Sequence, residues 1–337
     1  MVSSPASTRD VTELQRRIRD VAAERRAVIL AHNYERPEVQ DVAHYVGDSL
    51  GLSREAAKTD ADIIVFCGVH FMAETAAILS PHKTVLLPDL AAGCSLASTI
   101  DADQLRVWKS EHPGAVVVAY VNTTAEVKAE SDYCCTSGNA VEVVNAIPAD
   151  REILFLPDMF LGAHVRRISG RPNIHVWMGE CHVHAGIDPE NIRLQRSRHP
   201  EAEFLIHPEC GCATSVVEAV SAGDVDPEGV HILSTEGMIK RPGVSASESF
   251  IIATEVGILH RLRKAYPDKT FYAANEQASC AYMKVTTLPK VLASLEQLQH
   301  RITVPDAIAT RARLSIERMV SIGGNAPPPA PDVDPGE

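Results

Sequence analysis

The chain has 337 residues, with 32 Lys and Arg against 44 Asp and Glu, so its formal net charge is −12. This acidic balance argues against nucleic acid or an anionic membrane as the main partner. The aromatic content of 5% is also low for a protein that stacks on bases. A single hydrophobic core usually stops growing near about 250–300 residues, so we expect two or three subdomains.

The ends of the chain differ in character from its middle. Residues 10–26 place their apolar side chains on one helical face, which predicts an N-terminal helix within residues 1–26. We expect a C-terminal helix over residues 301–322 and a disordered tail over 323–337, because GGNAPPPAPDVDPGE cannot bury apolar surface. No stretch has the roughly 20 apolar residues of a membrane span, and no signal peptide is evident. We therefore expect a cytoplasmic protein, whose cysteines stay reduced.

Apolar runs that end in polar residues recur three times along the chain. They cover residues 27–34, 115–122 and 203–209. The triplets that close them are His32-Asn33-Tyr34, Tyr120-Val121-Asn122 and His207-Pro208-Glu209. Their last residues lie 88 and then 87 positions apart. This spacing indicates an internal repeat, although any α/β protein gives apolar runs at irregular spacing.

Two further apolar runs follow each of these. The second runs cover residues 62–67, 152–158 and 229–235, and the third runs cover 83–89, 173–179 and 269–275. One cysteine comes shortly after each third run, namely Cys94, Cys181 and Cys280. Strands that alternate with helical patterns predict parallel sheets with right-handed crossovers. We therefore predict three pseudo-symmetric three-layer α/β units around a central site, over residues 27–112, 113–198 and 199–300.

The three cysteines all follow predicted strand ends. Ligands of open α/β sheets bind beyond the carboxyl ends of the strands, so three facing units would bring these thiols together. A structural zinc usually takes four ligands with paired local spacing, which these cysteines lack. Three cysteines on a 4Fe-4S cluster would leave one iron open as a Lewis acid. The alternative is that all three are buried structural thiols, because free cysteine is often buried.

The other five cysteines form a second group, for which we expect packing rather than ligation. Cys67 lies in an apolar run, adjacent cysteines rarely ligate one metal, and the Cys-Gly-Cys segment has no counterpart in the other units. The other four cysteines of this group are Cys134, Cys135, Cys210 and Cys212.

Small residues that open helical stretches offer anion sites. Ser49 lies 15 residues after Tyr34, and Ser137 lies 15 residues after Asn122. Thr235 is the expected counterpart in the third unit, after an insertion of about ten residues. A helix N-terminus presents free N–H groups that suit phosphate or carboxylate. The alternative is that these residues are ordinary helix caps.

The acid–base candidates are His32, Tyr34, His207 and Glu209. A histidine titrates near neutral pH, and a glutamate in a closed site can have a raised pKa. We hypothesise that Glu209 is a general base, because it stands at a strand end in the third triplet. His182 and His184 are expected to shape the pocket around Cys181.

Motifs between residues 27 and 300 resemble the quinolinate synthase family. In chain order they are AHNY (31–34), GDS (47–49), AYVNTTAEVKAESD (119–132), CTSGNA (135–140), PD-x-x-LG (157–162), W-x-GEC (177–181), HPEC (207–210) and SC-x-YM (279–283).

The resemblance implies a pseudo-threefold α/β fold with one 4Fe-4S cluster on Cys94, Cys181 and Cys280. It implies condensation of iminoaspartate with dihydroxyacetone phosphate to quinolinate, phosphate and two waters, in de novo NAD synthesis and linked to the enzyme that makes iminoaspartate. It also implies proton-transfer roles for Tyr34 and Glu209, beside the candidate His32. The implied substrate-binding residues are His32, Ser49, Tyr120, Val121, Asn122, Ser137, His207, Pro208, Glu209 and Thr235.

Three other functions are compatible with the same residues. One is a different hydro-lyase with the same open iron. Another is a non-enzymatic iron–sulfur sensor, which an acidic chain without a basic DNA-reading patch disfavours. The third is a cluster-free α/β enzyme in which all eight thiols are inert.

Overall fold

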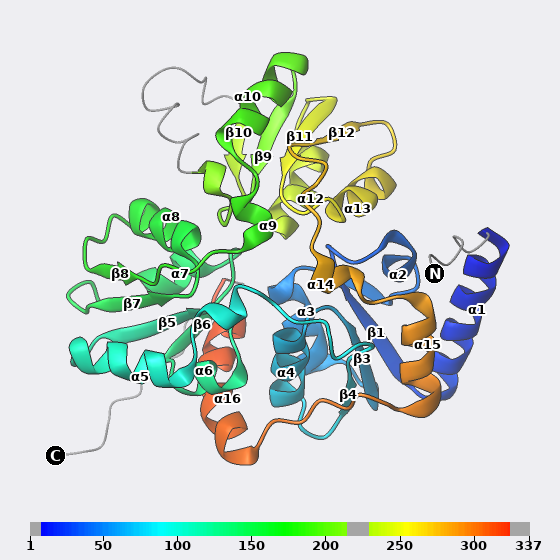
Figure 1. Cartoon of the computed structure of the whole chain (residues 1–337), viewed down its shortest axis with the longest axis horizontal. Helices are drawn as coiled ribbons and strands as arrows, with labels where there is room; N and C mark the ends of the chain where they lie inside the picture. Colours follow the sequence, from blue (N-terminus) through cyan, green and yellow to red (C-terminus); the bar gives the residue numbers. More distant parts are fainter. Residues whose placement is uncertain (1–7, 214–228, 324–337) are drawn as a thin grey trace.

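Three four-stranded parallel sheets, each flanked by helices, make up the computed structural model, which describes residues 8–213 and 229–323 (Figure 1). The predicted class of three three-layer α/β units is confirmed. The tail predicted over 323–337 lies outside the described residues from position 324 onward. The predicted insertion lies mostly outside them as well, because residues 214–228 are not described. The residue boundaries of the three units stay a prediction.

The three sheets share one strand order. In the first sheet it is β2-β1-β3-β4, and the others repeat it as β6-β5-β7-β8 and β10-β9-β11-β12. The first sheet contains β1 (Ala27–His32), β2 (Tyr45–Gly47), β3 (Ile63–Cys67) and β4 (Thr84–Leu86). The second contains β5 (Val116–Tyr120), β6 (Tyr133–Cys135), β7 (Ile153–Leu156) and β8 (Ile174–Val176). The third contains β9 (Glu203–Ile206), β10 (Val230–Ile232), β11 (Ser249–Ala253) and β12 (Thr270–Ala273).

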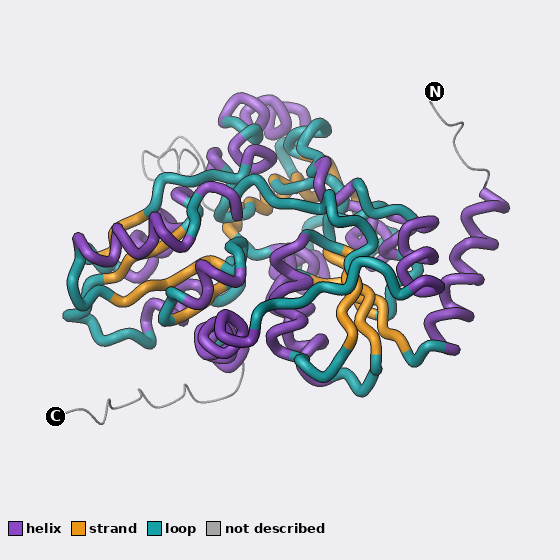
Figure 2. The backbone as a smooth tube through the Cα atoms, turned by 60° about the horizontal axis from the view of Figure 1, so that its bottom comes forward, coloured by secondary structure: helices purple, strands orange, loops and turns teal. Residues whose placement is uncertain are grey.

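The central strands are almost continuously apolar because helices cover both faces of each sheet. All residues of β3, β5 and β7 are buried. Figure 2 shows this arrangement for the first unit, where helices lie on both sides of the strands. The outer strands are shorter, with only three residues in β2, β6 and β10, which is why the sequence did not reveal β2 and β6.

One strand of the third unit differs from the prediction. The repeat pattern pairs residues 229–235 with the central strands at 62–67 and 152–158, which is wrong. In the structure, β10 instead pairs with β9 at the sheet edge, as β2 pairs with β1. The true central counterpart is β11, which pairs with both β9 and β12 and was missed. The longer connection after β9 displaces this strand from the repeat spacing.

Helices connect the strands and cover the sheets. Those of the first unit are α1 (Thr8–Glu24), α2 (Pro37–Gln40), α3 (Ser49–Lys58) and α4 (His70–Leu79), followed by a short 3₁₀ turn (Ala97–Thr99). The second unit has α5 (Ala102–Glu111), α6 (Ala125–Ala129), α7 (Ala140–Asn145) and α8 (Met159–Ser169). Helices α9 (His182–Ala185) and α10 (Pro189–Arg198) follow, and their buried residues pack in one cluster with β9 and β11 of the third sheet. The remaining helices are α12 (Thr235–Val244), α13 (Ile258–Ala265), α14 (Ala281–Lys284), α15 (Leu288–Gln297) and α16 (Asp306–Ser321).

The terminal helices join the units together. The apolar face predicted for the N-terminal helix is confirmed, because Ile18, Val21 and Ala22 of α1 are buried in a cluster that includes residues of α15. The C-terminal helix begins later than predicted, at Asp306, because the preceding residues pair with β4 through a bridge between Leu86 and Arg301. Helix α16 then packs against α4, α6 and β6 (Figure 1), which links the first unit to the second. None of the described helices combines the length and apolarity needed to span a bilayer.

Candidate active site

A cavity of about 720 Å³, counting space open to solvent, lies where the three units meet, and residues of all three line it. Figure 1 places α9 and α14, the short helices after Cys181 and Cys280, between the three sheets. The shared site predicted beyond the strand ends is therefore present as a cavity.

Residues at the carboxyl ends of the first strand of each unit line this cavity. His32 ends β1, Tyr120 ends β5, and Glu209 follows β9. The triplet members at the wall are His32, Tyr34, Tyr120, Asn122, His207 and Glu209.

Val121 and Pro208 are the two predicted site residues that do not line the cavity. Both are buried, and the N–H of Val121 donates to the carbonyl oxygen of Cys135 at 2.8 Å. Side chains alternate in direction along an extended segment, so the middle residue of each triplet points away from its neighbours.

Cys94, Cys181 and Cys280 all line the cavity and are partly exposed. They follow β4, β8 and β12, so each unit contributes one thiol from the same place in its sheet. Burial raises the pKa of Cys94 to about 12, and the nearby thiols of Cys181 and Cys280 add to this shift. The structure therefore brings together three cysteines that are distant in sequence.

The three thiols do not form a closely packed set of ligands for a single ion. Among the described residues, the sets of ligand atoms that lie within 4.8 Å of one another do not include the Cys94–Cys181–Cys280 triad. Cysteine thiolates are the usual ligands of iron–sulfur clusters, so the chemistry of these donors is compatible with such a group.

The five other cysteines are fully buried, and none lines the cavity. Burial raises the pKa of Cys67, Cys134, Cys135 and Cys210, which keeps these thiols protonated and unreactive. The thiol of Cys134 lies 3.4 Å from Oγ of Ser315 on α16. Their placement agrees with the packing role that the sequence predicts.

Two of the three predicted anion-binding residues open helices as expected. Ser49 is the first residue of α3, whose cap Asp48 accepts a hydrogen bond from the N–H of Gly51 at 2.7 Å. Thr235 is the first residue of α12, whose cap is Ser234. Both Ser49 and Thr235 line the cavity.

Ser137 also lines the cavity but does not open a helix. Helix α7 begins three residues later, at Ala140, because Asn139 closes a turn by accepting the N–H of Thr136 at 2.8 Å. The Oγ of Ser137 lies 3.1 Å from Nε2 of His207.

The loops that carry these three hydroxyls converge. A Cβ atom added to Gly138 would meet Oγ of Ser234 at 3.5 Å and Oδ2 of Asp48 at 3.7 Å, so the Ser137 loop packs against the caps of α3 and α12. Nδ2 of Asn33 donates to Oγ1 of Thr235 at 3.1 Å, which orients that hydroxyl. Each unit thus contributes one hydroxyl to the same region of the wall.

A chain of hydrogen-bonding groups crosses the three units. The Tyr34 hydroxyl lies 2.5 Å from Oγ1 of Thr254, which lies 2.9 Å from Nε2 of His184. Nδ1 of His184 lies 3.1 Å from Oε2 of Glu209, and the Tyr120 hydroxyl donates to Oε1 of Glu209. The chain can therefore hold a proton at several neighbouring atoms.

The pKa values along this chain separate acids from bases. Burial alone would raise the pKa of Glu209, as the sequence analysis anticipated, but His184 and His207 outweigh it and lower the pKa to about 2. Burial lowers the pKa of His184, yet Cys181 and the carboxylate of Glu209 raise it well above its usual value. Burial also raises the pKa of Tyr34. A carboxylate and a protonated phenol therefore share one wall at neutral pH.

His32 and His207 behave differently from His184. Burial lowers the pKa of each to about 3, so both rings are neutral at physiological pH. A neutral imidazole can donate from one nitrogen and accept at the other, which suits a role in orienting a polar substrate.

Sequence reasoning missed several residues of the site. His184 was expected only to shape the pocket, and Thr254 and Glu255 were not considered. The last two follow β11, so the apolar run over residues 249–253 with polar residues at its end was the signal that could have found them. Oε1 of Glu255 accepts the N–H of Cys280 at 3.0 Å and lies 3.0 Å from Nζ of Lys284, which fixes the loop that carries the thiol.

Fold and site together define a class of protein: a threefold repeat of α/β units that closes around one cavity, with three thiols and a buried acid–base chain. This is the organisation of an enzyme that acts on a small molecule.

Comparison with known proteins identifies the family. The family model described as "Quinolinate synthetase A protein" matches residues 16–321. Quinolinate synthase from Mycobacterium tuberculosis is 57% identical over 306 residues, which cover 91% of this chain and 88% of that protein. The relative from Mycobacterium sp. (strain KMS) is also 57% identical, with 91% of each chain covered, and that from Mycolicibacterium paratuberculosis is 56% identical. The chain belongs to the quinolinate synthase family, as its motifs predicted.

Proposed function

We propose that this chain is a quinolinate synthase that condenses iminoaspartate with dihydroxyacetone phosphate to give quinolinate, phosphate and two waters. The observation that carries the proposal is the single cavity into which each unit brings one thiol and one hydroxyl. Membership of the family supports the same reaction. The enzyme would act in the cytoplasm in de novo NAD synthesis, supplied by the enzyme that makes iminoaspartate.

Cys94, Cys181 and Cys280 are the residues that would hold a 4Fe-4S cluster. When bound by three cysteines, such a cluster supplies an iron with a free position, which acts as a Lewis acid toward a substrate oxygen or nitrogen. The hydrogen bond from Cys280 N–H to Glu255 and that between Ser95 Oγ and His182 Nδ1, at 2.6 Å, would hold the ligand loops in place.

The proposed substrates are anions, so the cavity must offer groups that stabilise negative charge. No lysine or arginine is present among the described residues that line it. The N-termini of α3 and α12, each ten residues long, offer free N–H groups and the positive end of a helix dipole. The hydroxyls of Ser49, Ser137 and Thr235 would bind the phosphate or carboxylate oxygens. Asn122 and the neutral rings of His32 and His207 would then orient the polar groups of the substrates.

The acid and base roles follow from the environments of Glu209 and Tyr34. Glu209 is ionised at neutral pH, so it can accept a proton from a substrate carbon without first losing one. Tyr34 keeps its proton and can donate it to a substrate. Thr254 and His184, which follow Tyr34 in the hydrogen-bonded chain, can then pass a proton back to it. Tyr120 donates to Glu209 and holds the carboxylate in position. Two groups on one wall with opposite protonation states are what isomerisation and ring closure require.

The first experiment is anaerobic purification, followed by an assay with iminoaspartate and dihydroxyacetone phosphate. We expect a brown protein with about four irons per chain that forms quinolinate, and that loses activity on exposure to oxygen. A fully loaded protein that forms no quinolinate from these substrates would refute the proposed reaction.

The thiols can be sorted by substitution. Cys94→Ser, Cys181→Ser and Cys280→Ser should each abolish activity and lower the iron content. Cys134→Ser is the matched control, because that thiol is buried away from the cavity, and its effect should be mild. Equal damage from Cys134→Ser and Cys94→Ser would contradict this assignment.

The base can be tested separately. Glu209→Gln should lower kcat at least about 100-fold while the cluster absorbance stays intact, because general-base catalysis contributes that much. Near-normal turnover in this variant would exclude Glu209 as the base.

A further inference from the structure

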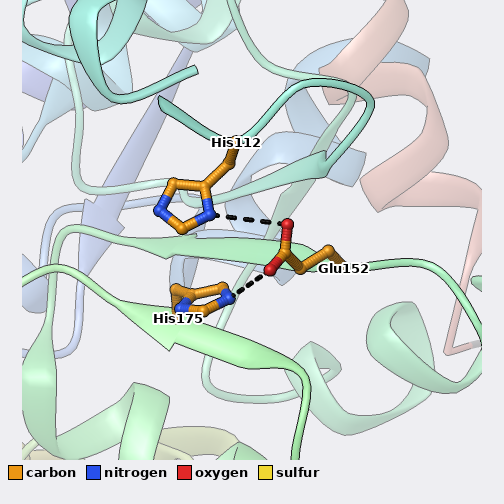
Figure 3. A group of neighbouring side chains, drawn as sticks. All are labelled: His112, Glu152 and His175. Carbon is orange, nitrogen blue, oxygen red and sulfur yellow. Dashed lines mark hydrogen bonds and ion pairs between the residues drawn. The ribbon is translucent and has the colours of Figure 1, made fainter. Parts of the chain in front are cut away.

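A second group of metal-binding side chains lies in the second unit, away from the cavity. It consists of His112 at the end of α5, Glu152 directly before β7, and His175 in β8 (Figure 3). Glu152 stands at the amino end of its strand, whereas the cavity lies beyond the carboxyl ends. The two sites are therefore on opposite edges of the same sheet.

The ligand atoms of this group already face one another. Nδ1 of His112 lies 3.4 Å from Oε2 of Glu152, and Nε2 of His175 lies 2.7 Å from Oε1. Each residue offers one ligand atom, and all three atoms lie within 4.8 Å of one another. Figure 3 shows both imidazole rings directed at the carboxylate. Tetrahedral zinc with bonds of about 2.0–2.1 Å needs ligand atoms about 3.3 Å apart, so small side-chain rotations would suffice.

The backbone around the group is firmly held. The carbonyl oxygen of Glu152 accepts the N–H of Val116 at 2.8 Å, and Leu154 pairs with His175 in the sheet. The ring of His112 packs edge-on against Trp108 and lies 4.4 Å, centroid to centroid, from the ring of His175. Sites built on strands keep their ligands more precisely placed than sites on free loops.

Solvent can reach the group. The side chains of His112, Glu152 and His175 are 23%, 41% and 41% exposed, so an ion could enter without local unfolding and keep a water ligand. Two imidazoles and one carboxylate are a donor set for zinc and its neighbours among the transition metals, whereas Mg²⁺ and Ca²⁺ prefer oxygen alone.

We propose that His112, Glu152 and His175 bind one divalent transition-metal ion of the zinc type, with at least one position left for water. The ion would lie between the two rings and the carboxylate. It would tie the connection between α5 and β5 to β7 and β8, and so stabilise the second unit. Nothing in its position gives it a part in turnover at the cavity.

The test uses the cluster-loaded enzyme, so that the cavity cysteines are not free to take zinc. Zinc would be titrated anaerobically in competition with a chromophoric chelator. We expect one ion per chain, with affinity at least tenfold weaker in His175→Gln and in Glu152→Gln and unchanged in His82→Gln, an exposed histidine elsewhere. Quinolinate formation should be the same in all of these variants. Circular dichroism would verify that each is folded.

Zinc X-ray absorption on the same samples identifies the ligands. A first shell of nitrogen and oxygen alone is expected, since no sulfur belongs to the group. Sulfur in that shell, or equal affinity in wild type and His175→Gln, would overturn the proposal. Failure to bind zinc at all would also overturn it, and would leave the two histidine–carboxylate contacts as ordinary hydrogen bonds.

Discussion

Glu35, which follows the first polar triplet, is a deeply buried carboxyl group. Its side chain is completely inaccessible, and its polar neighbours, the Thr286 hydroxyl and the backbone of Arg36, lower its pKa less than burial raises it. Burial raises the pKa of Glu35 to about 8, which the charge of Lys284 on α14 only partly offsets and Glu255 reinforces. Cys67 on β3 also faces this carboxyl. We therefore predict that Glu35 is protonated in the folded protein at neutral pH.

The size of the effect follows from the two pKa values. Between the ordinary value of 4.5 and about 8, the folded state keeps a proton that the unfolded state releases. The free energy of unfolding therefore falls as the pH rises, by about 1.4 kcal/mol per pH unit for this group. The stabilising contribution is complete below pH 4.5 and is lost through pH 8, for a total of about 3–5 kcal/mol.

Urea unfolding at pH values from 5 to 8.5 would measure this effect in wild type and Glu35→Gln. Glutamine keeps the shape of the neutral acid but cannot ionise, so the variant should become more stable than wild type as the pH rises. Glu24→Gln, at an exposed position of α1, controls for the loss of one carboxylate. A difference between wild type and Glu35→Gln that is constant across this range would refute a neutral Glu35.

Two further substitutions probe the supports of the cysteine loops. Lys284→Met leaves the completely buried Glu255 without its cation and should lower the free energy of unfolding by about 3 kcal/mol. Adding Glu255→Gln removes the unpaired charge and should restore most of this loss. Urea unfolding of the single and double variants measures both effects. Gly179→Ala would place a Cβ atom against the backbone oxygen of Pro157. This clash should lower the free energy of unfolding by about 1–3 kcal/mol and reduce the iron content of the protein. Gly93→Ala, beside Cys94, makes only ordinary contacts and should be tolerated, so equal losses in the two glycine variants would contradict the packing argument.

Much of the fold could be predicted because the strands of parallel sheets have a clear local sequence pattern. The central strands are covered on both faces, so β1, β3, β5, β7 and β9 appear in the sequence as continuous apolar runs. Polar residues at the ends of these runs marked the cavity edge, and the spacing of 88 and 87 residues between the last members of the polar triplets marked the repeat. The strands that were missed had weaker signals, either because they are three residues long, as in β2 and β6, or because β11 was out of step with the repeat.

Other features of the site give no signal in the nearby sequence. His184 follows Cys181 in a four-residue helix, and nothing nearby in the sequence indicates that it reaches Glu209 in another unit. The pKa of Glu209 is lowered, whereas the sequence suggested that it would be raised. Burial, which raises this pKa, could be expected from the sequence, but the nearby charge of His184, which lowers it, could not.

The sequence by itself determined the class of fold, the number of units, and which thiols and hydroxyls stand at strand and helix ends, because each of these depends on patterns within a few residues. Only the tertiary structure decided which of those groups meet. Convergence of Tyr34, His184 and Glu209 on one wall depends on how three units pack against one another. The pairing of His112 with His175 across Glu152 depends instead on packing within the second unit. In both cases no local periodicity specifies contacts between segments that are distant along the chain.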